Sequence, residues 1–353
     1  MLTVPAPESV ISRSIATASL LAYLAVSKFA DHLPLHRQAR MLARAGVKLP
    51  VSTLSDWMHR TAMKLAPLRS GLAARIVQSK YTSLDDTRLE MQRNSKKLKR
   101  KRCFLWAYRS PSGETVFDFS LSRAGSEPLR FLSGMKGHVQ GDGYAAHNVL
   151  FGAGSGRIRV GCLAHARRRF VDAMDSDPER ASLAVALIGR LYDVEREAKE
   201  SGLGEEARGA LRRERCPLIF SMLRDLLKVW EPEVLPTSAM GDAIGYMLRQ
   251  WDTLLIYVQN GQIEIDNTAI ERSIRGIALG RRNCLFVGSE QGGHDAAIFY
   301  SLIESCRGAD VEPMEYLTDV IGRLHDRLSE SEVEELLPAR WKATRDAERD
   351  AAD

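Results

Sequence analysis

The sequence has 353 residues, of which 44% are hydrophobic and 27% are charged, with a formal net charge of +5 at pH 7. This length suggests two or three domains with sizeable cores, and the composition is ordinary for a soluble globular protein. A run of about 18 apolar residues is absent, which excludes a transmembrane helix, and the N-terminus lacks the pattern of a secretion signal. The five cysteines are scattered without a CxxC pair, so we expect a reduced, cytoplasmic protein rather than a disulfide framework.

Residues 15–80, after a flexible segment at 1–14, are predicted to form a helical domain. Thr17 is a suitable cap for a first helix, and a second helix at 35–46 would be stopped by Gly46.

Ser52 is a suitable cap for the next helix, so this helix and the one before it have the helix-turn-helix pattern. The side chains available to face DNA would be Ser55, His59, Arg60 and Lys64. The alternative is a plain helical hairpin, and Asp56 favours it because a carboxylate on the outer side would repel phosphate.

The segment RNSKKLKRKR at 93–102 carries seven basic residues in ten. Such clustering favours a polyanionic partner such as DNA. The alternative is a solvated hairpin tip. The residues expected to contact phosphate are Lys96, Lys97, Lys99, Arg100, Lys101 and Arg102.

From residue 81 the pattern changes to short runs rich in aromatic and β-branched residues, which predict strands. Three strands form a meander, a helix follows near 126–133, and two more strands at HVQGDGY and RIRVGCLAH flank a short helical piece. This βββαβαβ order predicts an RNase H-like core with a mixed five-stranded sheet in which the first and fourth strands are neighbours. Their adjacency would bring together Asp85 and Asp142, each expected at the end of a strand.

The core is predicted to be interrupted. Residues 81–171 form its first part, 172–258 a helical insertion suited to packing or dimerisation, and 259–329 its second part. The segment 283–289 could add one extended piece. Residues 330–353 form a C-terminal tail.

A helix at IDNTAIERSIRGIALG carries the third acid, Glu271. At 3.6 residues per turn, Ile270, Ile274 and Ile277 share one apolar side, while Glu271 lies on the next. The alternative is a capping box in which Glu271 bonds back to a cap at Thr268.

Two strand-borne aspartates and one helical glutamate are the groups that hold two divalent cations in an RNase H-like active site. Mg²⁺, or Mn²⁺ in its place, suits carboxylate oxygens. Two alternatives stay open: Asp86 adjoins Asp85 and could belong to a turn, and Asp142 between two glycines is by default a turn residue.

Other polar residues surround these acids in the sequence. Cys162 and His165 have the spacing of half a zinc site, but no second pair completes it. His165 could act near the scissile phosphate or be an orienting histidine. Phosphate contacts are expected from Arg167, Arg168, Arg169, Arg272, Arg275, Arg281 and Arg282.

Together these segments resemble transposases of the insertion sequence 66 class, bacterial DDE enzymes that cut and join DNA at the ends of their own element. The matching segments are LLAYLAVSKFADHLPLHRQ (20–38), STLSDWM (52–58), SLDDT (83–87), GDGYAAHN (141–148), CLAHARRRF (162–170), IDNTAIERSIRGIALGRRNCLFVGS (265–289), AAIFYSLIESCRGADVEPMEYL (296–317) and LPARW (337–341). The family commonly has Glu where Asp86 stands and Asn where Thr268 stands.

The resemblance implies that Asp85, Asp142 and Glu271 are the catalytic and metal-binding triad. It also implies that the partners are transposon-end DNA, target DNA and companion proteins of the element. The protein is expected to form a homodimer or higher synaptic assembly and to act in the cytoplasm at the nucleoid. Fuller members carry an N-terminal coiled coil and a zinc-binding segment that this sequence does not match, which suggests a shortened copy. The rival functions are an RNase H-like nuclease that only cleaves and a DNA-binding regulator or inactive remnant.

Overall fold

The computed structural model describes residues 10–12, 14–92, 101–325 and 327–351. The chain divides into two compact units, formed by residues 1–79, 85–134 and 270–353 and by residues 80–84 and 135–269. Across the described ranges, every helix is too short or too polar to cross a membrane.

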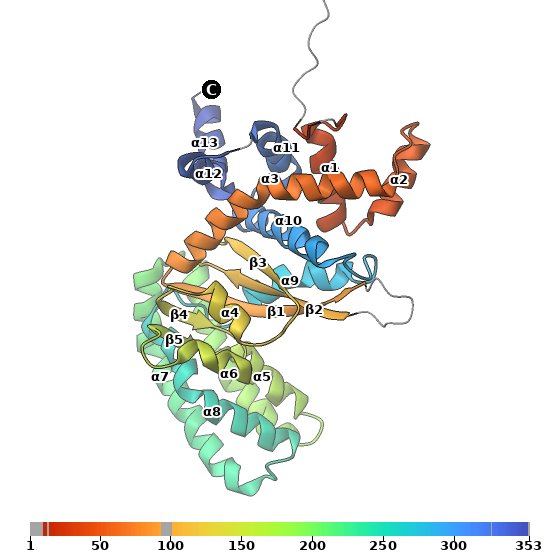
Figure 1. The fold of residues 1–353 in the computed structure, drawn as a ribbon. Helices are drawn as coiled ribbons and strands as arrows, with labels where there is room; N and C mark the ends of the chain where they lie inside the picture. The colour runs from red at the N-terminus through yellow and green to blue at the C-terminus, as the bar shows by residue number, and fades with distance from the viewer. Residues whose placement is uncertain (1–9, 13, 93–100, 326, 352–353) are drawn as a thin grey trace, which may run out of the picture. The chain divides into compact units, whose positions relative to one another are not determined.

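The first unit contains the N-terminal and C-terminal helices and part of the sheet (Figure 1). Its helices are α1 (Ala18–Phe29), α2 (Leu35–Arg44), α3 (Val51–Gln78), α4 (Ser126–Phe131), α10 (Glu290–Gly308), α11 (Pro313–Arg323), α12 (Glu330–Leu336) and α13 (Pro338–Asp350). It also holds β2 (Lys101–Arg109), β3 (Thr115–Ser120) and most of α9 (Thr268–Gly280).

The expected start of α1 is confirmed and that of α3 is wrong. Thr17 Oγ1 accepts a hydrogen bond from the main-chain N of Leu20 at 3.2 Å. Ser52 is inside α3, because the extended backbone of Pro50 (φ −61°, ψ 146°) lets the helix begin at Val51. The predicted stop at Gly46 is confirmed by its positive φ of +89°, which only glycine adopts without strain.

Helix α10 covers the edge strand β3. The main-chain N of Thr115 donates to Ser305 Oγ at 3.0 Å, and that of Phe117 donates to Ser301 Oγ at 2.8 Å. These serines satisfy groups that an open sheet edge would leave unpaired. The helix also carries Gly308 against the β2–β3 turn, where a Cβ on Gly113 would lie 2.7 Å from the Gly308 carbonyl oxygen.

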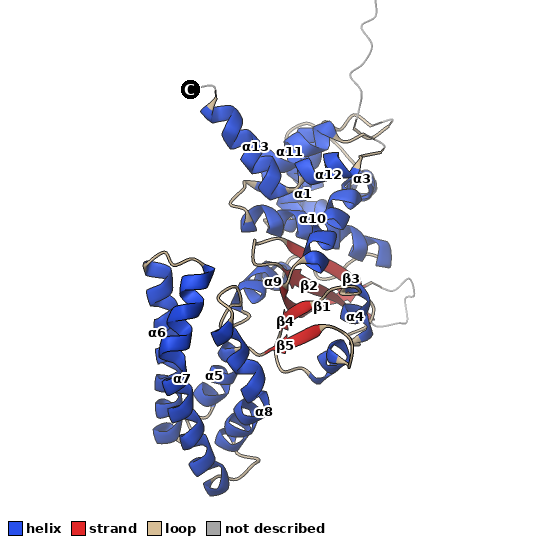
Figure 2. Ribbon diagram, turned by 90° about the vertical axis from the view of Figure 1, so that its left-hand side faces the viewer, coloured by secondary structure: helices blue, strands red, loops and turns tan. Residues whose placement is uncertain are grey.

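The second unit holds the start of β1 (Tyr81–Met91), β4 (Gly137–Gln140) and β5 (Arg157–Val160). Its helices are η1 (Ala145–Phe151), α5 (Leu163–Asp172), α6 (Pro178–Glu200), α7 (Glu205–Trp230), η2 (Glu231–Glu233) and α8 (Ala239–Gln259). Figure 2 shows α6 and α7 as a long helical pair. The predicted helical character of 172–258 is therefore confirmed.

The five strands form one mixed sheet in the order β3-β2-β1-β4-β5. Strands β1 and β4 are parallel, as are β4 and β5, whereas β2 and β3 are antiparallel. The predicted neighbourhood of the first and fourth strands is confirmed.

Two sequence-based expectations for the sheet need correction. Asp85 lies inside β1 and not at its end. Only the first three residues of β1 pair with β4, and β1 continues beyond them to Met91. The segment 283–289 contributes only a single parallel bridge, between Met91 and Val287.

Candidate active site and nucleic-acid interface

The segments that lead to two of the candidate acids are neighbours in the second unit. Ser83 of β1 is in parallel register with Gln140 of β4. Asp85 and Asp142 each follow this pair by two residues. The next positions are also close, since a Cβ on Gly141 would lie 3.4 Å from the carbonyl oxygen of Leu84.

Asn267 connects the third segment to these strands. It is fully buried, and its Nδ2 donates to the carbonyl oxygen of Leu84 at 3.1 Å. Its main-chain N donates to Cys162 Sγ at 3.3 Å. Glu271 follows Asn267 by four residues, in the first turn of α9.

Leu84, Gly141 and Asn267, which shortly precede the three acids in the sequence, thus lie close together within the second unit. Asp85 and Glu271 themselves belong to the first unit, and Asp142 belongs to the second. The meeting of the three carboxylates stays a prediction.

A buried polar network supports this part of the sheet. Gln140 Nε2 donates to the carbonyl oxygens of Gly161 at 3.0 Å and Glu264 at 2.8 Å. Tyr81 donates its hydroxyl to Gln140 Oε1. Burial raises the pKa of Tyr81, so the phenol remains a hydrogen-bond donor at neutral pH.

The neighbouring acids Asp85 and Asp86 have different surroundings. Arg123 Nε binds both carboxylate oxygens of Asp86, at 2.9 and 3.0 Å, and the Asp86 side chain is only 5% exposed. Asp85 Oδ1 accepts the main-chain N–H of Asp86 at 2.8 Å. The ion pair with Arg123 therefore engages Asp86, and a metal-binding role of Asp85 stays a prediction.

Asp142 occupies the expected turn after β4. Its Oδ1 accepts the main-chain N–H of Tyr144 at 3.2 Å. The side chain is 31% exposed, so the turn leaves the carboxylate accessible for a second role.

His147 is a neighbour of Asp142 that the sequence patterns did not single out. It is buried, and its Nδ1 lies 3.6 Å from Asp142 Oδ1. The one sequence signal for it was its position in GDGYAAHN, five residues after the aspartate.

Thr268 is the first helical residue of α9, and its main-chain N donates to Asp266 Oδ1 at 2.9 Å. The capping box between Thr268 and Glu271 stays an alternative. The apolar side is as predicted, since Ile270, Ile274 and Ile277 are buried in the core of the first unit.

Cys162 and His165 are close together at the start of α5. His165 Nδ1 lies 3.2 Å from Cys162 Sγ, the same sulfur that accepts the N–H of Asn267. This pair ties α5 to the segment that enters α9. An auxiliary function of His165 stays a prediction.

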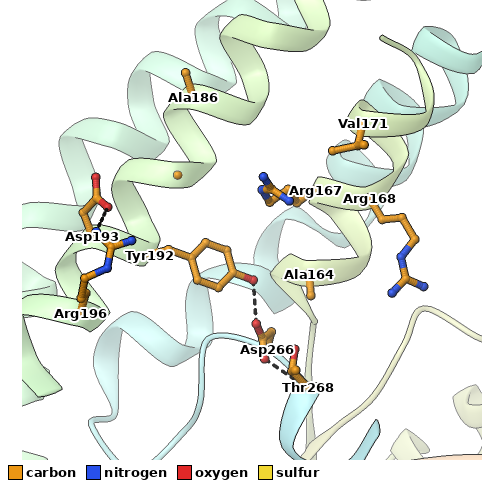
Figure 3. Close-up of a pocket in the computed structure, with 11 residues that line it drawn as sticks. Ala164, Arg167, Arg168, Val171, Ala186, Tyr192, Asp193, Arg196, Asp266 and Thr268 are labelled. Atoms are coloured by element: carbon orange, nitrogen blue, oxygen red, sulfur yellow. Dashed lines mark hydrogen bonds and ion pairs between the residues drawn. The ribbon is translucent and has the colours of Figure 1, made fainter. Parts of the chain in front are cut away.

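A cavity of about 700 Å³ opens between α5 and α6 in the second unit (Figure 3). Arg167 points into it, and Arg168 and Arg196 also line it. Tyr192 donates its hydroxyl to Asp266 Oδ2 at 2.7 Å, and burial raises the pKa of Tyr192. Asp193 accepts a hydrogen bond from Arg196 at 2.9 Å. Three arginines and two aspartates line the cavity, so its formal charge is positive by one.

The other candidate DNA contacts have varied surroundings. On α3, Arg60 donates to the carbonyl oxygen of Ser12 at 2.9 Å, and His59 is held by Asp295 at 3.0 Å. On and after α9, Arg281 donates to the carbonyl oxygen of Arg88 at 2.8 Å, whereas the exposed basic residues are Arg272, Arg275 and Arg282.

Lys96, Lys97, Lys99 and Arg100 lie outside the described residues, while Lys101 and Arg102 begin β2. On α3, Lys64 is half-buried.

The α/β core with a mixed sheet, the acids that follow two parallel strands and the basic cavity fit an enzyme that acts on a phosphate-bearing substrate. Comparison with known families is more specific. The family model described as "Transposase IS66 family" matches residues 13–295, and the "IS66 C-terminal element" matches residues 301–339. The chain therefore belongs to the IS66 family of transposases.

Curated relatives come from Sinorhizobium fredii. The uncharacterized protein y4jD is 36% identical over 355 residues, covering 96% of this chain and 69% of its own length. The uncharacterized proteins y4qI and y4hP are 33% and 30% identical, again over 96% of this chain. The matches span 65% and 64% of their lengths, so this chain corresponds to about two thirds of each relative.

Proposed function

We propose that this protein is a DDE transposase that cleaves DNA at the ends of its element and joins the freed 3′-hydroxyl to target DNA. Its catalytic residues would be Asp85, Asp142 and Glu271. The observation that carries this proposal is the parallel register of Ser83 with Gln140 together with the hydrogen bond from Asn267 to Leu84, because these residues shortly precede the three acids.

The donor chemistry of the three acids fits Mg²⁺. All three supply carboxylate oxygens, which hard divalent cations prefer, and Mn²⁺ would be accepted by the same ligands. Bound Mg²⁺ would activate the attacking hydroxyl and stabilise the leaving oxygen of the phosphodiester. The protein would orient these ligands through Asn267 and through the turn that holds Asp142.

The cavity between α5 and α6 supports a role in holding the DNA backbone. Arg167 and Arg168 line it, as do Asp266 and Thr268, which come shortly before Glu271 on the chain. Guanidinium groups bind phosphate with paired hydrogen bonds. We assign further phosphate contacts to Arg272, Arg275, Arg281 and Arg282 on and after α9.

We also propose an RNase H-like fold for the core, which the strand order β3-β2-β1-β4-β5 supports. The domain limits proposed are 15–80, 81–171, 172–258 and 259–329, with terminal segments at 1–14 and at 330–353, the second of which holds α12 and α13.

Helices α2 and α3 would act as a helix-turn-helix with Arg60 and Lys64 toward DNA, and the basic run through Lys101 and Arg102 would add contacts. The exposed Asp56 is compatible with this role because Arg60 Nη1 lies 3.8 Å from it and offsets its charge. The protein would act at the nucleoid as a homodimer or larger synaptic assembly, with companion proteins of the element.

The proposal is tested with purified protein and labelled element-end DNA in Mg²⁺. We expect nicking at the end and, with a pre-cut end, joining to a target duplex. Cleavage without joining would identify an RNase H-like nuclease instead. Binding that persists in EDTA without any cleavage in Mg²⁺ or Mn²⁺ would identify a regulator or an inactive remnant.

A further inference from the structure

Helix α7 has an apolar side in addition to the one that packs into the core of the second unit. The core side carries Cys216, Phe220, Leu223, Leu227 and Trp230. A second set, which we call the α7 stripe, consists of Leu211, Arg215, Leu218, Met222, Asp225 and Val229.

Three apolar members of the α7 stripe are unusually exposed. Leu218 is 70% exposed, Met222 44% and Val229 58%. The members are spaced alternately by four and three residues, which places them along one side of the helix in the pattern of a helix-pairing seam. An exposed apolar seam on a helix indicates an interaction surface.

The α7 stripe is symmetric about position 220. Its members lie two, five and nine residues before and after that position. A two-fold axis there would pair the stripe with an identical one running in the opposite direction. Leu218 would then face Met222 of the second copy. Leu211 is half-buried against the core of its own unit, and its exposed part would lie opposite Val229.

The charges of the stripe select this antiparallel arrangement. It places Arg215 opposite Asp225 of the second copy, and the two-fold axis repeats that pair. A parallel arrangement would instead place Arg215 on Arg215 and Asp225 on Asp225.

The intramolecular contacts of Arg215 do not oppose such pairing. Its nearest acids are Glu214 at 3.4 Å and Glu197 at 3.9 Å, and all three side chains are more than half exposed. Exposed ion pairs of this kind contribute little to stability, so Arg215 can exchange partners at small cost.

We propose that two copies of this chain associate through their α7 stripes in an antiparallel, two-fold symmetric pair. This inference is independent of the catalytic proposal, because the association needs neither DNA nor metal. It assigns to the helical insertion the role of holding two copies together.

Light scattering coupled to size-exclusion chromatography, with the full chain and no DNA, tests the pair. We expect the unaltered protein to be a dimer at micromolar concentration and Met222→Glu to be a monomer with unchanged helical circular dichroism. The matched control is Met63→Glu, which changes another exposed methionine, on α3, and should remain a dimer. A monomeric unaltered protein, or a dimeric Met222→Glu protein, would overturn the proposal.

Exchanging the charges of Arg215 and Asp225 tests whether the two helices pair in the antiparallel direction. Arg215→Asp and Asp225→Arg should each raise the dissociation constant about tenfold, the equivalent of about 1.4 kcal/mol. The double variant should restore the affinity of the unaltered protein, because the two opposite charges are then exchanged. If the double variant is as weak as the single variants, the antiparallel pairing is wrong.

Discussion

Ser83 on β1 and Gln140 on β4 form a parallel register pair, and each lies two residues before an acidic residue. Both strands run in the same direction from this pair, so the chain reaches Asp142 just after β4 ends and Asp85 where β1 continues without β4. This relationship supports the proposal that Asp85 and Asp142 belong to one site.

The first prediction concerns the triad. Asp85→Asn, Asp142→Asn and Glu271→Gln should each lower the rate of Mg²⁺-dependent strand cleavage about a thousandfold, because each removes a charged metal ligand worth several kcal/mol. DNA affinity should be nearly unchanged in a binding assay with EDTA.

Asp86→Asn is the matched control for the triad, because Asp86 is engaged by Arg123 and adjoins Asp85. It should retain cleavage. Normal cutting by any of the three triad variants would refute the assignment.

The second prediction concerns Asn267 as a positioning residue. Asn267→Ala removes the hydrogen bond to Leu84 and should lower the cleavage rate about tenfold to a hundredfold, as for other groups that orient metal ligands. It should also raise the Mg²⁺ concentration needed for half-maximal cleavage, which a loss of stability alone would not do. Asn148→Ala, at an exposed asparagine, is the control, and an unchanged Mg²⁺ requirement in Asn267→Ala would contradict the role.

The third prediction concerns Arg212, which is fully buried in the second unit. It binds Glu195 at 2.6 and 2.7 Å and the carbonyl oxygens of Tyr257, Asn260 and Ile263. Arg212→Met should lower the free energy of unfolding in urea by about 3–5 kcal/mol, because the half-buried Glu195 would lose its cation and three carbonyl oxygens would lose their donor.

Arg213→Met provides the comparison, since it makes the same change at the next, exposed arginine. Its free energy of unfolding should lie within about 0.5 kcal/mol of that of the unaltered protein. Equal effects of the two substitutions would show that the buried pair is not the stabilising feature.

The fourth prediction concerns the basic run. Replacing Lys96, Lys97, Lys99 and Arg100 with glutamine should reduce the dependence of DNA affinity on salt by about 0.9 in logarithmic slope for each phosphate that the run no longer neutralises. A titration at several salt concentrations measures this slope. Replacing Arg340 and Arg349 on α13, which pair with Glu334 and Glu315, should leave it unchanged. A slope that does not change in the first variant would exclude this run from the interface.

The sequence by itself predicted most of the elements and the neighbourhood of the first and fourth strands, but it did not predict α12 and α13, which lie in the segment 330–353 expected to be a tail. Side-chain alternation and helical periodicity are local properties, so β1 to β5, the helical region 172–258 and the buried side of α9 could all be predicted from neighbouring residues. The same local patterns did not show that β1 continues past Asp85, because strand length depends on what lies beside the strand.

Only the tertiary structure decided which polar residues are held together. The hydrogen bond from Asn267 to Leu84 and the ion pair of Asp86 with Arg123 each join residues that are far apart in the sequence. The burial of Arg212 likewise depends on how the helices pack. An asparagine, aspartate or arginine carries no local signal of its partner. The role of such a residue depends on which buried polar groups need a hydrogen-bond partner once water is excluded. That requirement is a property of the packed fold.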